Sequence, residues 1–269
     1  MEFRTIVDVG DPGFRIEPCE EMLFVGSCFA DNIGARFKEE KFRATVNPFG
    51  VMYNPASILH TVERLSLAEP SILGSLRTAF FTLGTNHIYR LKETGEIVDN
   101  CQKRPQSLFT EEELTVDECA NYLQKAIDIL RAANPDIHVV LTVSPIRYRK
   151  YGYHGSQLSK ATLLLATRQV AGASYFPAYE IINDELRDYR FYAEDMLHPS
   201  SQAVEYIWQR LSEVYLSDAA KQFIKEWQPL KAALNHKPFN PESQEYRIFM
   251  DKTMLKIAEL QKKYPNFAL

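Results

Sequence analysis

The sequence lacks the features that mark several classes of protein. No run of about 18 apolar residues occurs, so no transmembrane helix is expected. The net charge is only −4, which gives no sign of a nucleic acid or an anionic membrane as partner. The four cysteines are widely spaced without a CxxC pair, which argues against a zinc site and against a disulfide scaffold. There is no Gly-rich phosphate loop and no carboxylate pair suited to glycosidase chemistry. We therefore expect no metal and no organic cofactor.

The composition is that of an ordinary globular protein. The 269 residues are 45% hydrophobic and 25% charged, enough for one large α/β domain or a domain with an appendage. The opening stretch MEFRTIVDVGDPGF has no basic start followed by an apolar core, so it does not read as a signal peptide. Together with the cysteine pattern, this predicts a cytoplasmic protein.

Apolar patterning alternates between strand and helix from Leu23 to about Tyr215. The stretch DIHVVLTVSP is a near-continuous apolar run of strand length, as expected for a strand buried on both faces. TVDECANYLQKAIDILRAANP carries an amphipathic helical stripe, and another helix is expected to begin at Pro55 with Asn54 as its N-cap. This alternation predicts right-handed βαβ units and a mostly parallel sheet covered on both faces.

Other segments give more local expectations. The tail from about Ser217 reads as helices only, with a partial apolar stripe in SQEYRIFMDKTMLKIAELQKKY. Residues 39–40 and 111–113, all glutamates, are interpreted as solvated helix faces. Residues 147–154 are interpreted as an aromatic and basic loop, followed by a helix over 159–173. The last long helix of the α/β region is expected to hold Pro199 in its first turn.

The stretch LFVGSCFADNIG places a serine and a cysteine where the first buried strand turns into a helix. In an open α/β sheet, ligands bind beyond the carboxyl ends of the strands, so this turn is a candidate site. A second candidate is EDMLHPSS, in which Asp195 and His198 stand three residues apart. That spacing lets the carboxylate face the imidazole and fix its tautomer, leaving the other ring nitrogen free to take a proton from a serine. By itself the DxxH pair is a weak signal, since Asp195 could simply cap the following helix.

Several stretches in order resemble one protein family. GSCFA at residues 26–30 looks like the signature that names the GSCFA family, which resembles the SGNH (GDSL-like) hydrolases. The resemblance runs from about Phe14 to Tyr215. It is carried by NPFGVMYNP, TLGTNHIYR, VDNCQKRP, LTVSPIRY, HGSQLSKATLL and EDMLHPSSQAVEYIW. It implies a flavodoxin-like three-layer α/β/α hydrolase domain over residues 1–216, with residues 217–269 as a helical C-terminal extension.

The resemblance also implies roles for particular residues. Ser27 matches the nucleophile, and Asp195 and His198 match the acid–base pair. The oxyanion hole would use the backbone N–H of Ser27, Gly50 from NPFG, and Asn86 from the GTN stretch. Asn54 and Asn100 are alternatives to Asn86 as the amide donor.

The sequence departs from the SGNH pattern at two points. Gly26 stands where an acidic residue usually precedes the serine, and His87 stands where the GxND block usually ends in Asp. Arg147 and His154 are candidates for the rim of a pocket suited to a carbohydrate or an anionic acyl group, and His87 is a further candidate. A solvated loop or a purely structural hairpin is the plainer interpretation of these residues.

The adjacent serine and cysteine must be distinguished. A thiol at a helix N-terminus can be reactive, but neighbouring residues on a helix point in different directions. If Ser27 faces the site, Cys28 should face the core, where cysteine is a common packing residue. The plainer interpretation of Ser27 itself is a helix N-cap. We interpret the serine as the catalytic residue and the cysteine as a packing residue.

These features predict a serine hydrolase that cleaves an O-acyl or carbohydrate ester through an acyl-serine intermediate. The expected partner is a small-molecule or glycan ester, and the sequence leaves the oligomeric state open. Two alternatives remain. The acyl group could pass to an alcohol or amine on a glycan or small molecule, or the fold could serve as a ligand-binding module without catalysis.

Overall fold

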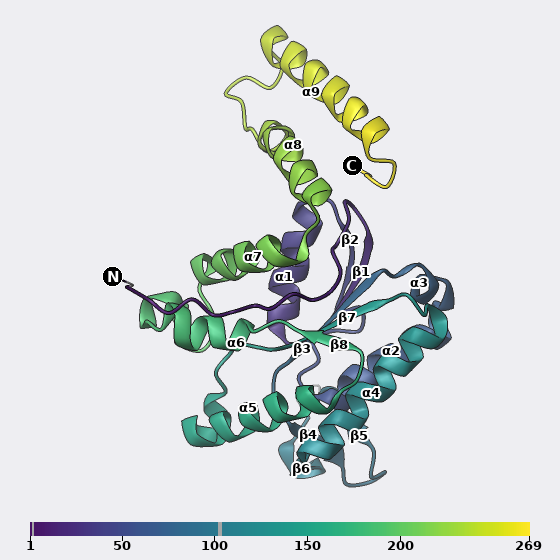
Figure 1. Ribbon diagram of the computed structural model, residues 1–269, viewed down its shortest axis with the longest axis vertical. Helices are drawn as coiled ribbons and strands as arrows, with labels where there is room; N and C mark the ends of the chain where they lie inside the picture. Colours follow the sequence, from purple (N-terminus) through teal and green to yellow (C-terminus); the bar gives the residue numbers. More distant parts are fainter. Residues whose placement is uncertain (2, 102–103) are drawn as a thin grey trace.

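A parallel sheet forms the centre of the computed structural model, which describes residues 1, 3–101 and 104–269 (Figure 1). Its five strands lie in the order β2-β1-β3-β7-β8, and every neighbouring pair is parallel. The strands are β1 (Glu21–Gly26), β2 (Arg43–Val46), β3 (Thr78–Leu83), β7 (His138–Val143) and β8 (Ala173–Tyr175). This is the strand order of flavodoxin-like folds, in which ligands bind beyond the carboxyl ends of the strands. The predicted fold class is confirmed.

Helices cover both faces of this sheet. They are α1 (Cys28–Glu39), α2 (Pro55–Ala68), α3 (Pro70–Ser75), α4 (Val116–Ala133), α5 (Gly152–Gln169), α6 (Ala178–Glu180) and α7 (Ser201–Tyr215). Alternate residues of a strand point to opposite faces of the sheet, so each strand contributes side chains to two hydrophobic cores, one on each face. Phe24 and Phe80 pack with α1 and α7, whereas Val25 and Phe81 pack with α2, α4 and α5. All six residues of β3 are buried, as expected for a strand that helices cover on both faces.

A small antiparallel sheet is inserted between β3 and α4. It consists of β4 (His87–Leu91), β5 (Ile97–Val98) and β6 (Phe109–Glu113), in the order β5-β4-β6. The interpretation of residues 111–113 as a helix face is therefore wrong, because these glutamates lie in β6. Cross-strand charge pairs favour the strand, since Glu112 pairs with Arg90 at 3.0 Å. Gln102 and Lys103 of the VDNCQKRP stretch lie outside the described residues.

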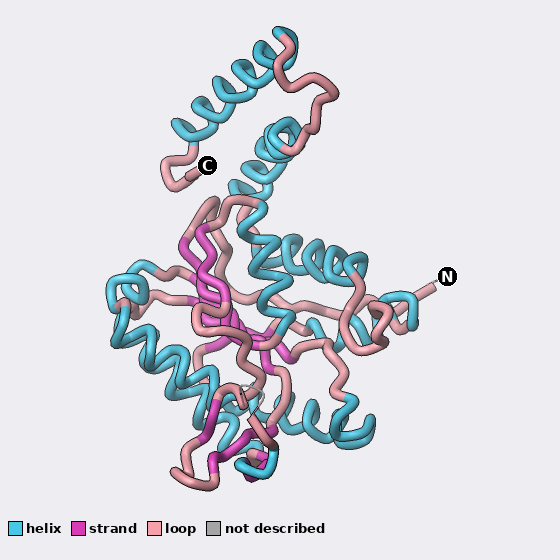
Figure 2. Tube along the Cα trace, turned by 180° about the vertical axis from the view of Figure 1, so that it is seen from behind, coloured by secondary structure: helices cyan, strands magenta, loops and turns pink. Residues whose placement is uncertain are grey.

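The C-terminal segment folds as two helices, α8 (Asp218–Leu234) and α9 (Gln244–Lys263), as predicted. They share a small core of their own that includes Trp227, Leu230 and Ile257. Figures 1 and 2 show them at the end of the molecule opposite the small sheet. The tail therefore lies away from the carboxyl edge of the main sheet, where the predicted site residues are.

Residues 39–40 at the end of α1 were expected to be a solvated face, and the structure corrects this for Glu40. The Glu40 side chain is fully buried and pairs with Arg36 at 2.9 Å and with Lys231 of α8 at 3.0 Å. The indole N–H of Trp227 also donates to the Glu39 carbonyl oxygen at 2.9 Å. Arg36 within α1 and Lys231 from the packed helix α8 together supply the cations that make burial of this carboxylate tolerable.

Two element boundaries differ from the sequence expectation. Helix α5 begins at Gly152, so Tyr153 and His154 lie in its first turn and not in a loop. Pro199 precedes Ser200, which is the N-cap of α7, and so lies just outside that helix. Ser200 accepts a hydrogen bond from the Ala203 N–H, and this cap sets the start of the helix.

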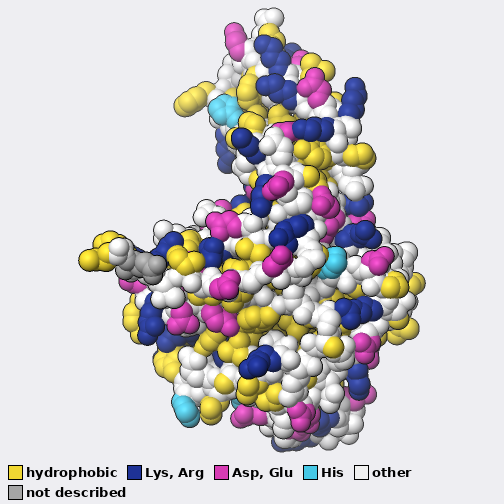
Figure 3. Space-filling view, in the orientation of Figure 1, with side chains coloured by type: hydrophobic (Ala, Val, Ile, Leu, Met, Phe, Trp, Pro, Cys, Tyr) yellow, Lys and Arg dark blue, Asp and Glu magenta, His cyan; other side chains and the backbone are white. Residues whose placement is uncertain are grey.

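The described surface carries both signs of charge. Figure 3 shows Lys and Arg interspersed with Asp and Glu over the visible face, in keeping with the net charge of −4. No helix in the described part of the chain is long and apolar enough to cross a bilayer.

Candidate active site

The turn between β1 and α1 is shaped by the close approach of β1 to β3. Gly26 has a φ of +147°, and a Cβ at this position would lie 2.2 Å from the Thr82 carbonyl oxygen. Only glycine fits such an approach in this backbone conformation. The turn delivers Ser27 and Cys28 to the carboxyl edge of the sheet, where the family resemblance predicts the nucleophile.

Ser27 is fully buried and points toward β3. Its hydroxyl lies 3.2 Å from the Thr82 hydroxyl and accepts a hydrogen bond from the Phe29 N–H at 3.3 Å. Its own N–H donates to the Thr82 carbonyl oxygen at 3.1 Å. Ser27 is thus the N-cap of α1, which is the plainer of the two interpretations considered for it.

Cys28 is the first residue of α1 and is half-buried. Its thiol lies by the hydroxyl of Tyr53. Burial first, and then the charge and hydrogen bond of Cys28, raise the pKa of Tyr53 to about 12. Cys28 packs against the core between the sheet and helices α1 and α7, as expected of a packing residue. The fully enclosed side chain, however, is that of Ser27, which was expected to face the site.

Asp195 and His198 are in contact, as their spacing predicts. His198 Nδ1 lies 2.5 Å from Asp195 Oδ2, while Asp195 Oδ1 accepts the N–H groups of Leu197 at 2.9 Å and His198 at 3.0 Å. The His198 backbone and side-chain hydrogen bonds, followed by that of Leu197, lower the pKa of Asp195 to about 2. The carboxylate is therefore ionised at neutral pH and holds the imidazole by Nδ1, which leaves Nε2 available to accept a proton.

The turn that carries this pair is strained and anchored. Met196 has a φ of +59°, an uncommon conformation for a side chain of its size. Arg147, just beyond the end of β7, donates its N–H to the Leu197 carbonyl oxygen and Nη1 to the Met196 carbonyl oxygen, both at 3.0 Å. These bonds hold the Asp195–His198 turn against the carboxyl edge. Within the described residues, no hydrogen bond or ion pair joins Ser27 to His198.

The three predicted oxyanion donors all have internal acceptors. Besides the N–H of Ser27, the N–H of Gly50 donates to the Asn47 carbonyl oxygen at 2.8 Å. Asn86 Nδ2 donates to the Leu114 carbonyl oxygen at 2.8 Å, which leaves its second amide hydrogen. Asn54, an alternative donor, caps α2 by accepting the Ser57 N–H at 2.9 Å. Asn100, the other alternative, is exposed.

The predicted pocket residues His87, His154 and Arg147 have different surroundings. His87 is buried, stacks on Tyr151 at 3.6 Å and has Nδ1 3.2 Å from a Glu111 carboxylate oxygen. His154 is exposed on α5. Arg147 packs over the rings of Tyr153 and Tyr192 and lines a cavity of about 440 Å³.

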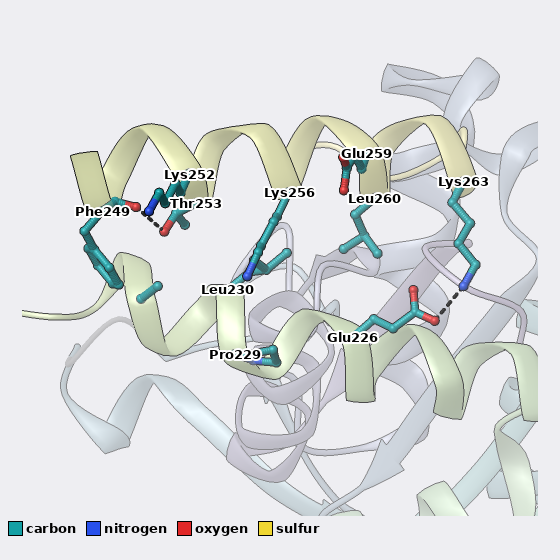
Figure 4. Close-up of a pocket in the computed structure, with 11 residues that line it drawn as sticks. Glu226, Pro229, Leu230, Phe249, Lys252, Thr253, Lys256, Glu259, Leu260 and Lys263 are labelled. Atoms are coloured by element: carbon teal, nitrogen blue, oxygen red, sulfur yellow. Dashed lines mark hydrogen bonds and ion pairs between the residues drawn. The ribbon is translucent and has the colours of Figure 1, made fainter. Parts of the chain in front are cut away.

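Other cavities lie away from these residues. The groove between α8 and α9 has a volume of about 500 Å³ and an apolar floor that includes Leu230 and Leu260 (Figure 4). Lys263 and Glu226 form an ion pair across one end of it at 2.5 Å. None of the predicted catalytic, oxyanion or pocket residues lines this groove. No group of three or more His, Cys, Asp or Glu side chains in the described ranges could hold a metal ion.

One face of α5 supplies supporting residues that the sequence analysis assigned no role. The fully buried Lys160 donates Nζ to the carbonyl oxygens of Gly84 at 2.6 Å and Ser144 at 2.8 Å. Ser159 accepts the Asn86 N–H at 3.0 Å, and Ser156 accepts the Tyr148 N–H at 3.2 Å. Polar residues at this spacing share one side of a helix, which was the available signal in HGSQLSKATLL. Burial lowers the pKa of Lys160 to about 7.

Comparison with solved structures gives distant matches. A Streptococcus pneumonia protein provisionally assigned as a platelet activating factor is 16% identical, with 74% of this chain and 84% of that chain covered and a TM-score of 0.46. A family 3 carbohydrate esterase from Talaromyces cellulolyticus is 11% identical. The match covers 77% of this chain and 99% of that chain, with a TM-score of 0.41. A catalytic mutant of the acetylxylan esterase Axe2 from Geobacillus stearothermophilus is 11% identical. The match covers 76% of this chain and 98% of that chain, with a TM-score of 0.44.

Sequence comparison is more specific. No functionally curated protein matches the chain. The model of the GSCFA family matches residues 21–72 and 68–211, and that of the GSCFA domain protein, C-terminal domain, matches residues 227–269. The first of these spans the β1–α1 turn, the GTN stretch and the Asp195–His198 turn. The chain belongs to the GSCFA family.

Proposed function

We propose that this protein hydrolyses ester bonds through a covalent acyl-enzyme formed at the carboxyl edge of the parallel sheet. The observation that carries the proposal is the Asp195–His198 pair, joined at 2.5 Å on a turn anchored to the end of β7. An ionised carboxylate on Nδ1 fixes the tautomer in which Nε2 can accept a proton. Such a pair can activate a hydroxyl or thiol and later protonate the leaving alcohol.

In one form of the proposal the nucleophile is Ser27, as the family resemblance implies, and it would complete a triad with His198 and Asp195. In this form of the proposal the Ser27 hydroxyl leaves Thr82, turns toward His198 Nε2 and attacks the ester carbonyl. The oxyanion would be held by the backbone N–H groups of Ser27 and Gly50 and by the remaining amide hydrogen of Asn86. Loss of one such donor typically costs about 10²–10³ in turnover.

The proposed substrate is an O-acyl ester of a carbohydrate or small molecule. Arg147, with the rings of Tyr153 and Tyr192 beside it, offers a cation and flat apolar surfaces next to the Asp195–His198 turn. Aromatic faces suit a sugar ring, and a guanidinium suits a carboxylate or other anionic group. Sugar esters and anionic acyl esters are accordingly the compounds to test first.

The test is hydrolysis of p-nitrophenyl acetate by the full chain and by variants of the pair. His198→Ala and Asp195→Asn should each lower kcat/KM by about 10²–10⁴-fold while circular dichroism stays unchanged. His236→Ala, which removes an exposed histidine from the loop after α8, is the control and should keep full activity. Turnover that is the same in His198→Ala as in the unaltered chain would refute the proposal.

A binding module without catalysis is the second candidate, and one observation favours it. The Ser27 hydroxyl and all three predicted oxyanion donors are engaged with internal partners. A fluorophosphonate probe distinguishes the two functions for a serine nucleophile, because a binder without an activated serine should not be labelled. Acyl transfer in place of hydrolysis is tested by product analysis with and without a sugar acceptor.

We further propose that the chain divides near residue 217 and functions in a reducing compartment. Ser217 caps α8, and α8 and α9 have their own small core, which supports a division at this point. All four cysteines are unpaired, as a reducing cytoplasm favours.

A further inference from the structure

We propose that Cys28, and not Ser27, is the residue that carries the acyl group. This inference rests on the ester-hydrolase function proposed above and concerns which atom of the β1–α1 turn attacks. It is based on the different surroundings of the two side chains, on two tyrosine hydroxyls beside the cysteine, and on the backbone N–H of Cys28.

Ser27 is built into the fold as a helix cap. Its hydroxyl accepts the Phe29 N–H and bonds to Thr82, and its side chain has no exposure to solvent. To attack a substrate, this hydroxyl would have to lose its hydrogen bond from the Phe29 N–H, which caps α1, and become exposed to solvent. A serine that fixes the first turn of a helix in this way serves to position the residue that follows it.

Cys28 is that following residue, and it is half-buried. Tyr53, itself 37% exposed, lies beside the thiol. Because burial and the neighbouring Cys28 raise the pKa of Tyr53 to about 12, this phenol keeps its proton at neutral pH. It can therefore donate a hydrogen bond to a sulfur that has become negatively charged.

A second tyrosine points to a ligand at the same place. The hydroxyl of Tyr148 is buried and has no hydrogen-bond partner among the described residues. Burial first, and then Tyr53 and Cys28, raise the pKa of Tyr148 well above its usual value, so this hydroxyl also stays protonated. It packs so closely on Gly84 that a Cβ there would lie 2.4 Å from the oxygen. A buried donor without an acceptor is what a bound carbonyl oxygen would satisfy.

The backbone of Cys28 provides an oxyanion donor. As the first residue of α1, Cys28 has no intrahelical acceptor for its N–H, and no other acceptor for it occurs in the described part of the chain. The N-terminus of a helix favours negative charge. When the sulfur of Cys28 attacks a carbonyl, the oxygen that becomes negative forms next to this free N–H, in contrast to the N–H of Ser27, which is bound to Thr82.

The base in this proposal is His198, on the turn that Arg147 anchors. Arg147, the neighbour of Tyr148, bonds to the carbonyl oxygens of Met196 and Leu197, which precede His198. His198 Nε2 takes the Cys28 thiol proton, and the thiolate forms a C–S bond with the ester carbonyl carbon. The C–O bond to the alcohol then breaks, the alcohol leaves with the proton from His198, and an acyl-thioester remains. Water, deprotonated by His198, attacks the thioester, and the thiolate leaves and regains the proton.

The experiment compares Cys28→Ala with Cys101→Ser, which alters another half-buried cysteine. Turnover of p-nitrophenyl acetate should fall at least about 10³-fold in Cys28→Ala and stay within about tenfold in Cys101→Ser. After an acid quench, peptide mass mapping should find the acetyl group on Cys28, where neutral hydroxylamine removes it. An acetyl group on Ser27, or full activity in Cys28→Ala, would overturn the inference.

A measurement without substrate separates this inference from the proposed function. Iodoacetamide should alkylate Cys28 at least about tenfold faster than Cys101, and His198→Ala should abolish that difference. If the chain hydrolyses no ester but Cys28 still shows His198-dependent alkylation, the ester-hydrolase function fails and the reactive thiol stands. If esters are hydrolysed but Cys28 reacts no faster than Cys101, the function stands and this inference fails.

Discussion

Replacing Lys160 by methionine tests how the carboxyl edge of the sheet is held together. Lys160 is fully buried, and its ammonium bridges the carbonyl oxygens of Gly84 and Ser144, just beyond the ends of β3 and β7. Burial lowers its pKa from 10.5 to about 7. Each pKa unit corresponds to about 1.4 kcal/mol, so keeping this group charged in the fold costs on the order of 5 kcal/mol.

The sign of the pH dependence follows from linkage. Between pH 7 and 10.5 the unfolded chain keeps the Lys160 proton and the folded chain loses it, so the free energy of unfolding rises with pH. Cys19 and Cys119 act in the opposite direction above pH 9, because burial raises the pKa of each thiol from 9 to about 12. The clean window is therefore pH 7–9, in which Lys160 should add about 2–3 kcal/mol.

The assay is urea unfolding followed by tryptophan fluorescence at pH 7, 8 and 9. Lys160→Met should lose the rise of about 1.4 kcal/mol per pH unit, while Lys225→Met, which removes an exposed lysine from α8, should retain it. The variant also leaves two buried carbonyl oxygens without a donor, at a cost of about 1–3 kcal/mol each. Equal pH slopes in Lys160→Met and the unaltered chain would refute the reasoning, because Lys160 would then be charged in both states.

Three further predictions concern the edge and the tail. Hydrogen bonds lower the pKa of Asp195 to about 2, so its carboxylate should stay ionised and bound to His198 from neutral pH to below pH 4. The bond between the two side chains should break as the pH falls through about 2. An NMR resonance for the His198 Nδ1 proton that disappears above pH 4 would contradict this. Gly26→Ala should cost at least about 3 kcal/mol in urea unfolding, since its Cβ would meet the Thr82 carbonyl oxygen at 2.2 Å, and a change below 1 kcal/mol would show that β1 and β3 can separate easily. Deleting residues 217–269 should promote aggregation, because it removes Lys231, one of the two cations paired with the buried Glu40. The soluble fraction should still react with an active-site probe, and a folded truncation that fails to react would show that the tail completes the site.

Much of the fold was predictable because its signals are local. The aromatic and β-branched residues of β3, the near-continuous apolar run of β7 and the amphipathic stripe of α4 indicate buried strands alternating with helices. Asn54 before Pro55 marked the start of α2, and the structure has the helix begin there. Strand β6 was missed because its glutamates carry no apolar alternation, and only pairing with β4 makes them a strand.

The candidate site was predictable in part. The spacing of Asp195 and His198 is short enough for a single turn to decide their contact, and the two side chains meet. The exposure of the two side chains in the β1–α1 turn depends instead on β3. The Ser27 hydroxyl bonds to Thr82 in the interior, and Cys28 is left half-buried. That choice involves residues 55 positions apart, which no pattern in GSCFA itself contains.

The sequence by itself determined the α/β class, the family, the Asp195–His198 pair and the helical tail, since each is encoded by periodicity, short spacing or ordered motifs. Only the tertiary structure decided the partners of Lys160, the burial of Glu40 and the order of burial of Ser27 and Cys28. Each of these depends on groups brought together from distant parts of the chain. The environment of a buried polar side chain is a property of the packed molecule and not of its neighbours in sequence.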